Sequence, residues 1–130
     1  MKNIGLSLLF SLISLVVISQ AVLPTSFSFA TVNLPVGWSE SESNLYSASG
    51  NTPPAKKFDT TGDNLIIHFA SAPGNLTYYL VGNPVPGGTF SGTFSVEQSD
   101  LGVVWTNLHT FTTAPTGYTL FTDVPLVSTR

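Results

Sequence analysis

The chain has 130 residues, of which 42% are hydrophobic and only 8% charged, with a net charge of −3 and no cysteine. That length suits one domain of ordinary size. Four basic residues provide no basic patch for a phosphate backbone, so the composition argues against nucleic-acid binding. Because disulfides are excluded, the folded part must depend on a hydrophobic core.

The N-terminal residues have the pattern of a secretory signal peptide. Lys2 precedes an apolar run from Ile4 to Ile18, and Ser19 and Ala21 are small residues at the −3 and −1 positions of a cleavage site. We therefore expect a helical signal peptide over residues 1–21. An alternative cleavage site follows Ala30, and the folded domain is expected over residues 31–130.

A retained membrane anchor is the rival interpretation of the same residues. The apolar run is shorter than the about 20 residues that span a bilayer, and it contains three serines. We therefore expect cleavage, and with it a secreted or cell-surface protein that has no membrane contact once the leader is removed.

Between residues 22 and 59 the pattern favours loops and short strands. Residues 22–36 form either a remnant of the leader or a loose first strand, and Pro35 and Gly37 disfavour regular structure before Trp38. The polar stretch 39–54 is expected to be a loop with one short strand at Leu45-Tyr46. Residues 55–59 are expected to form another short strand.

Two stronger strands follow, and both alternate with a period of two residues. One face of the first, residues 64–70, carries Leu65, Ile67 and Phe69. One face of the second, residues 75–82, carries Leu76, Tyr78 and Leu80, and its other face carries Thr77, Tyr79 and Val81. Both faces of the second strand are fairly apolar, which suits a strand that is covered on both sides.

Residues 89–111 predict a β-hairpin. The first strand alternates and places on one face Phe90, Gly92, Phe94 and Val96. Turn residues at 99–102 are followed by a second apolar run at 103–105, the expected start of the second strand. Because Trp105, Leu108 and Phe111 are spaced by three, this strand must bulge or bend if all three are buried.

A last strand is expected over residues 118–127, where Pro125 either ends the pairing or marks a sheet edge. About six short strands bounded by turn residues, with no helical pattern after the leader, predict an all-β protein. We expect an antiparallel β-sandwich.

Four segments occur in a characteristic order: LPVGW at 34–38, PPAKKF at 53–58, GDNL at 62–65 and FSVEQSDLGVVWTNL at 94–108. Together they resemble an N-terminal β-sandwich module of secreted multidomain proteins of Bacteroidota. The resemblance covers most of the mature chain and implies a jelly-roll-like fold that precedes nuclease, lamin-tail-like, adhesive or sorting domains. Its motifs are mostly core and turn positions, so it implies a fold rather than an activity.

The chain departs from that family in two places. The Asp-Gly of the hairpin turn is replaced by Leu101-Gly102, with the acid one position earlier at Asp100. Modules of this kind also continue past an arginine like Arg130 into one or two further strands. Either the domain is truncated at its C-terminus, or it closes with fewer strands. An open sheet edge would then favour weak self-association.

The candidate ligand-binding residues are Trp38, Tyr46 and Tyr79, aromatic side chains that an outer face would present to a sugar or a protein. Trp38 has two interpretations, a plug at one end of the core or a platform for a sugar ring. The serine-rich loop also carries Glu40 and Glu42, which we expect to be solvated rather than catalytic.

A calcium site is the alternative to the expectation of no cofactor. Asp59, Asp63 and Asp100 lie in or beside turns, where carboxylates and backbone carbonyls can surround calcium. Their spacing matches no calcium loop, and aspartate beside glycine is an ordinary choice for a turn.

The catalytic patterns are absent from the sequence: it has no Gly-rich phosphate loop, HExxH, Cys–His zinc spacing or Gly-x-Ser-x-Gly elbow. His68 and His109 lie on separate predicted strands. We therefore expect a non-catalytic exported module that binds a glycan or a neighbouring protein domain. The alternative is a truncated accessory domain of a larger secreted hydrolase or nuclease, with no activity of its own.

Overall fold

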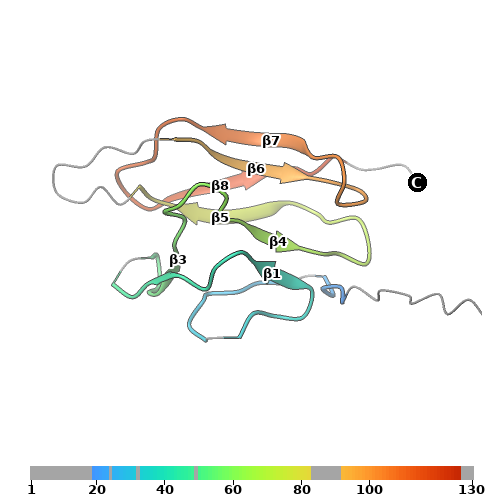
Figure 1. Cartoon of the computed structure of the whole chain (residues 1–130), viewed down its shortest axis with the longest axis horizontal. Helices are drawn as coiled ribbons and strands as arrows, with labels where there is room; N and C mark the ends of the chain where they lie inside the picture. The colour runs from blue at the N-terminus through green and yellow to red at the C-terminus, as the bar shows by residue number, and fades with distance from the viewer. Residues whose placement is uncertain (1–18, 24, 32, 49, 83–91, 127–130) are drawn as a thin grey trace, which may run out of the picture.

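The computed structural model describes residues 19–23, 25–31, 33–48, 50–82 and 92–126 (Figure 1). Of the leader expected over residues 1–21, residues 1–18 lie outside the described residues, as does Phe90 of the predicted hairpin. The described part is all-β, as predicted, with eight strands and no helix. It therefore also contains no helix that is long and apolar enough to cross a membrane.

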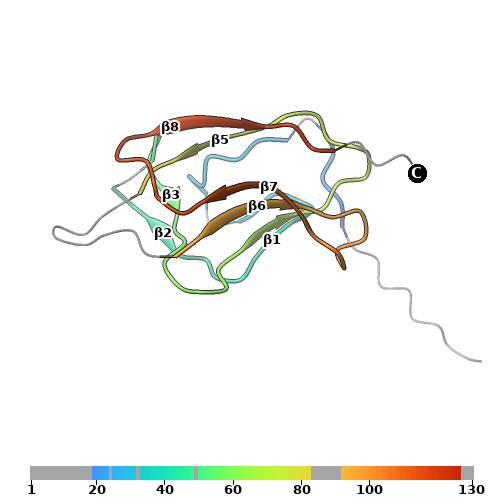
Figure 2. The ribbon, with the colours of Figure 1, turned by 90° about the horizontal axis from the view of Figure 1, so that it is seen from above.

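The strands are short and pair antiparallel in four ribbons of two, β1–β4, β2–β3, β5–β8 and β6–β7. Their bounds are β1 (Trp38–Glu40), β2 (Leu45–Tyr46), β3 (Ala55–Lys56), β4 (Leu65–Ile67), β5 (Leu76–Leu80), β6 (Phe94–Gln98), β7 (Thr106–Phe111) and β8 (Thr119–Asp123). Figure 2 shows β5–β8 on one side of the molecule and β6, β7 and β1 on the other, so the ribbons form two sandwich-like layers.

Alternation along β5 and β6 is confirmed, but the expectation that β5 is covered on both sides is wrong, because Thr77 and Tyr79 are exposed. On both strands the first, third and fifth residues are half-buried and the two between them are exposed. Phe94 of β6 points into an aromatic cluster, because its ring centroid lies 5.2 Å from that of Phe58 and 6.0 Å from that of Phe111. Phe111 in turn lies 4.8 Å from Phe121 of β8, so this cluster joins the two layers.

The hairpin formed by β6 and β7 contains a bulge. The condition for the expected bulge, burial of Trp105, Leu108 and Phe111 together, is not met, because Trp105 is 43% exposed. Val96 pairs with His109 and Glu97 pairs with Asn107, which leaves Leu108 as the extra residue. The prediction that the second strand starts at the apolar run 103–105 is wrong. Val103 is 79% exposed and Val104 76% exposed, and β7 begins only at Thr106. The bends after Asp100 carry this run out of the hairpin before pairing resumes.

A strand also forms where a loop was expected. Trp38–Glu40 is β1 and pairs with Leu65–Ile67 of β4, so the loop expected from residue 39 begins later. The turn before β1 depends on Gly37, whose φ of 83° is a left-handed conformation that favours glycine. Its carbonyl accepts a hydrogen bond from the backbone N–H of His68 at 2.8 Å, which extends the β1–β4 contact by one step.

The first described residues pack against this ribbon. Ala21 is 3% exposed, forms a parallel bridge with Phe69 and donates its N–H to the carbonyl of His68 at 2.6 Å. Further along, the ring of Phe27 lies 5.9 Å from Trp38 and 4.8 Å from Phe29. Residues before β1 thus contribute to the packing of the domain.

Candidate functional site

Trp38 is half-buried and in contact with Phe27, which favours the interpretation of this residue as a plug. Its indole Nε1 is buried and has no hydrogen-bond partner among the described residues. A ring whose polar atom faces the interior is poorly placed to stack on a sugar.

The other two aromatic candidates are exposed, but on different ribbons. Tyr46 on β2 is 37% exposed, and the Nζ of Lys57 lies 6.0 Å from the centre of its ring. Tyr79 on β5 is 51% exposed. With Trp38 on β1, the three candidates occupy three separate strand pairs, so the structure does not gather them into one aromatic site.

Tyr79 belongs to the exposed outer surface of the β5–β8 ribbon. Its partner across the ribbon is Leu120, which is 54% exposed, and the neighbouring pair on the same face is Thr77 with Thr122. We call these four residues the outer face. An aromatic ring and an aliphatic side chain beside two hydroxyl groups match a ligand that has both apolar and hydroxylated surfaces.

The opposite, inward face of the same ribbon holds a polar network that spans three strands. The carboxylate of Asp123 on β8, which is only 8% exposed, accepts a hydrogen bond from the hydroxyl of Tyr78 on β5 at 2.8 Å. Its other oxygen lies 3.1 Å from Nδ1 of His109 on β7. His109 also stacks on Phe111, with ring centroids 3.9 Å apart.

This network is a cross-layer contact with little nucleophilic character. Burial raises the pKa of Tyr78 far above its ordinary value, and the hydrogen bond to Asp123 and the charge of that carboxylate raise the pKa further. The phenol is therefore protonated at neutral pH, where it can donate to Asp123 but is a poor nucleophile. The geometry fits a structural role, in which the three side chains hold the two layers together.

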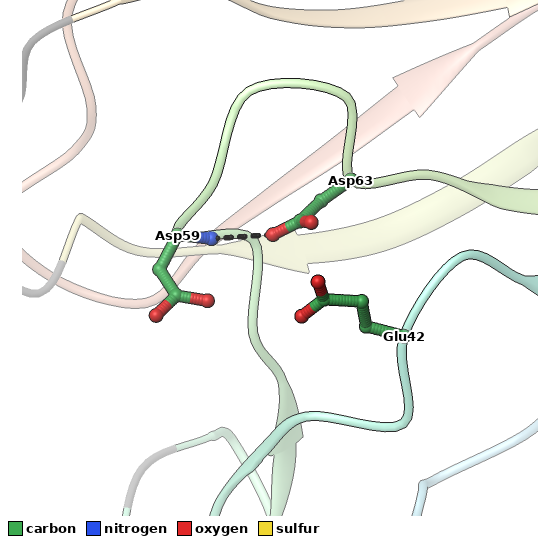
Figure 3. A group of neighbouring side chains, drawn as sticks. All are labelled: Glu42, Asp59 and Asp63. Carbon is green, nitrogen blue, oxygen red and sulfur yellow. Dashed lines mark hydrogen bonds between the residues drawn. The ribbon is translucent and has the colours of Figure 1, made fainter.

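A group of three carboxylates lies at the turn between β3 and β4 (Figure 3). Oxygen atoms of Glu42, Asp59 and Asp63 all lie within 4.8 Å of one another. Of the three residues proposed for calcium, Asp59 and Asp63 lie together. The third member of the group is Glu42, whereas Asp100 lies in the turn after β6.

Each member of this carboxylate group has a donor from the protein. Asp63 accepts the backbone N–H groups of Thr60 and Asp59, both at 2.9 Å, and these bonds lower the pKa of Asp63. Asp59 pairs with Nζ of Lys57 at 2.5 Å, and Glu42 accepts from the side-chain amide of Asn44 at 2.6 Å. The arrangement is that of an acidic turn stabilised by its own donors.

Glu40 is not solvated as expected. Its carboxylate lies 3.0 Å from Nζ of Lys56 on β3, and the two side chains are only 15% and 4% exposed. Lys56 also donates to the backbone carbonyl of Glu42. The pair therefore links β1 to the β2–β3 ribbon, a contact that neither residue's local sequence reveals.

One feature of the sequence indicates that Asp123 belongs to a buried polar network. Asp123 follows Phe121 by two residues, so a carboxylate shares the inward face of a strand with an aromatic ring. A carboxylate in that position requires donors from elsewhere in the fold. Its partners, Tyr78 and His109, belong to strands that only the tertiary structure brings together.

Comparison of the chain with protein-family models, with curated proteins and with solved structures finds no match. The resemblance to a module of secreted Bacteroidota proteins therefore stays a prediction, and a functional proposal has to start from the surfaces of the described residues.

Proposed function

We propose that the chain is an exported, non-catalytic β-sandwich module that binds a glycan through the outer face of the β5–β8 ribbon. The observation that supports this is the position of Tyr79, which is 51% exposed on a regular strand of the β5–β8 pair. An exposed aromatic ring on a regular strand offers a rigid, apolar surface to a ligand at little cost in side-chain entropy.

The neighbours of Tyr79 favour a sugar over a purely apolar ligand. Leu120 lies directly across the ribbon and extends the apolar surface by one residue, while Thr77 and Thr122 place two hydroxyl groups beside it. A pyranose ring has one apolar face and several hydroxyl groups at its rim, so each of the two chemical features has a counterpart.

Two observations support the non-catalytic part of the proposal. The hydrogen-bonded network of Tyr78, Asp123 and His109 lies on the inward face of the ribbon, away from the outer face. The carboxylates of Glu42, Asp59 and Asp63 are occupied by donors of the protein itself. Neither group is positioned to act on a ligand that stacks on Tyr79.

A glycan array tests the proposal. We expect the exported chain to bind at least one class of glycan, and Tyr79→Ala to weaken that binding by at least about tenfold, because the central apolar contact is lost. Leu120→Ser should weaken it less. Tyr46→Ala is the matched control, since it removes an exposed tyrosine from another ribbon and should leave binding unchanged.

Three results would count against the proposal. Binding that responds equally to Tyr46→Ala and Tyr79→Ala would indicate unspecific contact. If the chain binds no glycan on the array but binds a purified neighbouring domain, and Tyr79→Ala abolishes that binding, the outer face belongs to a protein partner. A module that binds neither would favour the alternative of an accessory domain without a ligand of its own.

A further inference from the structure

The turn between β6 and β7 exposes an unusual amount of apolar surface. Its four large hydrophobic side chains are Leu101, Val103, Val104 and Trp105, exposed by 81%, 79%, 76% and 43%. We call these four residues the apolar tip. Scattered single hydrophobic residues on a surface are normal, but a contiguous apolar group marks a contact with a protein or a membrane.

The apolar tip has a defined turn at its base. The backbone N–H of Gly102 donates to the hydroxyl of Ser99 at 2.9 Å, and Gly102 has a φ of 70°, which favours glycine. The β6–β7 pairing resumes immediately afterwards at Thr106, opposite Gln98. The four side chains therefore project from a turn that two paired strands support.

Another exposed leucine lies beside this turn. Gln98 forms two hydrogen bonds with the backbone of Leu126, as acceptor from its N–H at 2.6 Å and as donor to its carbonyl at 3.2 Å. Leu126, which is 63% exposed, is thereby fixed next to the last residue of β6. Leu126 therefore extends the apolar surface from the β6–β7 turn to the segment after β8.

The first described residues emerge at the same end of the molecule. Figures 1 and 2 both show residues 19–22, the β6–β7 turn and the segment after β8 at one end of the sandwich. In the sequence, the apolar run Ile4–Ile18 precedes residue 19 directly. Before cleavage, the most apolar stretch of the sequence therefore directly precedes the end of the molecule that carries the apolar tip.

We propose that the apolar tip is a membrane-contact surface that inserts Leu101, Val103 and Val104 into the acyl boundary of an uncharged lipid bilayer. A projecting loop suits a bilayer, which has no fixed shape to complement, better than a flat protein partner. Trp105, less exposed and at the base of the tip, lies where tryptophan prefers the interface between acyl chains and headgroups.

The charge distribution selects the kind of lipid. The turn contains Asp100 and no basic residue, and the whole chain has a net charge of −3. Attraction to anionic headgroups therefore does not contribute, and binding rests on burial of apolar surface alone. This inference goes beyond the proposed glycan binding and uses a different part of the molecule; it also revises the expectation of no membrane contact after cleavage.

Fluorescence of Trp105 in vesicles tests the proposal. In the full chain with Trp38→Phe, Trp105 is the only tryptophan, because the chain has two. With phosphatidylcholine vesicles we expect a blue shift of its emission and quenching by brominated acyl chains. This signal reports the position of the tip whether or not the N-terminal apolar run also binds the vesicle.

Matched variants separate the tip from general hydrophobicity. Val103→Asp with Val104→Asp should reduce the quenching by at least about tenfold, since charged side chains resist transfer to the acyl region. Leu45→Asp, which alters an exposed leucine on β2, should leave it unchanged. Adding phosphatidylserine to the vesicles should not strengthen the signal.

Several results would overturn the proposal. An emission spectrum that ignores the vesicles, or quenching that survives the double aspartate variant, would show that the tip does not insert. Quenching that requires phosphatidylserine would indicate electrostatic binding elsewhere. Light scattering in the absence of lipid gives a further test. If it detects dimers that the double aspartate variant does not form, the apolar tip binds a second copy of this chain.

Discussion

Asp123 shows how one buried carboxylate connects both layers of the sandwich. It is 8% exposed, accepts a hydrogen bond from the hydroxyl of Tyr78 on the partner strand β5, and lies within hydrogen-bond distance of His109 in the opposite layer. A buried carboxylate without such partners would destabilise the fold, so the three residues are energetically coupled. Removing one partner leaves the other with an incomplete set of hydrogen bonds.

Tyr78→Phe should lower the free energy of unfolding at pH 7 by about 1 to 2 kcal/mol, because a buried carboxylate loses one donor. It should also change the pH dependence. The pKa of Tyr78 is raised in the folded state, so the folded protein retains this proton more tightly than the unfolded chain. The stability that this proton contributes is complete below the ordinary tyrosine value of about 10 and is lost as the pH rises above it.

Denaturant unfolding at pH 7 and at alkaline pH measures both effects. The wild-type chain should lose stability above the ordinary tyrosine pKa, and Tyr78→Phe should lose less. Tyr79→Phe is the control, since it removes the hydroxyl of the exposed neighbour on the same strand. An identical alkaline slope for all three proteins would exclude Tyr78 as the titrating group.

At the scale of elements, the turn before β1 depends on close packing against the N-terminal segment. Gly37 has a φ of 83°, and a Cβ built on it would lie 2.1 Å from the backbone nitrogen of Ala21. Gly37→Ala therefore combines an unfavourable backbone conformation with a clash against main chain that cannot rotate away. In the full-length chain, which retains Ala21, we expect it to lower the free energy of unfolding by about 2 to 4 kcal/mol.

Gly62→Ala separates the two contributions to that loss. Gly62 also has a positive φ, 99°, but a Cβ there would meet nothing within 4 Å. It should cost only the conformational part, about 1 to 2 kcal/mol. Equal losses for the two variants, measured by denaturant unfolding, would show that Ala21 does not pack on Gly37.

The strands differ in how far the sequence predicts them. β5 and β6 are predictable because their alternation is local. The bulge at Leu108 forms without burial of Trp105, the condition on which the spacing of three made it depend. The pairing of β5 with β8 is not local, and no sequence pattern in either strand predicts which strand it pairs with. The Tyr78–Asp123–His109 network and the Glu40–Lys56 pair are unpredictable for the same reason, because their members are distant in the sequence.

The prediction of a strand that starts at residues 103–105 is wrong for a different physical reason. The composition of this run suits a buried strand, but β7 pairs with β6 only from Thr106 onward, so three apolar residues remain in the turn. Periodicity describes which residues prefer a strand and cannot report where a hairpin begins to pair. For the candidate site, Tyr79 is exposed, as a ligand-binding residue requires, although the apolar character of both faces of its strand predicted cover on both sides. The other residues of the outer face are identified only by the strand register.

At the scale of the whole molecule, the domain boundary depends on the segment before β1. Residues 25–29 alternate between half-buried and exposed, as a strand does, and Phe27 and Phe29 are on the half-buried side. Phe27 contacts Trp38, whose indole nitrogen is buried. A mature chain that begins at Thr31 would lose this cover, whereas one that begins at Val22 would keep it.

Comparing these two mature forms tests whether the segment is part of the folded domain. Both lack Ala21, so they differ only in residues 22–30. In a Trp105→Phe background, we expect the shorter form to show red-shifted Trp38 emission and a free energy of unfolding lower by about 1 to 3 kcal/mol, since half-buried aromatic surface is lost. Phe27→Ala in the longer form should reproduce most of the shift. If both forms give the same emission and stability, the sandwich is complete without residues 22–30, and cleavage after Ala30 leaves the fold intact.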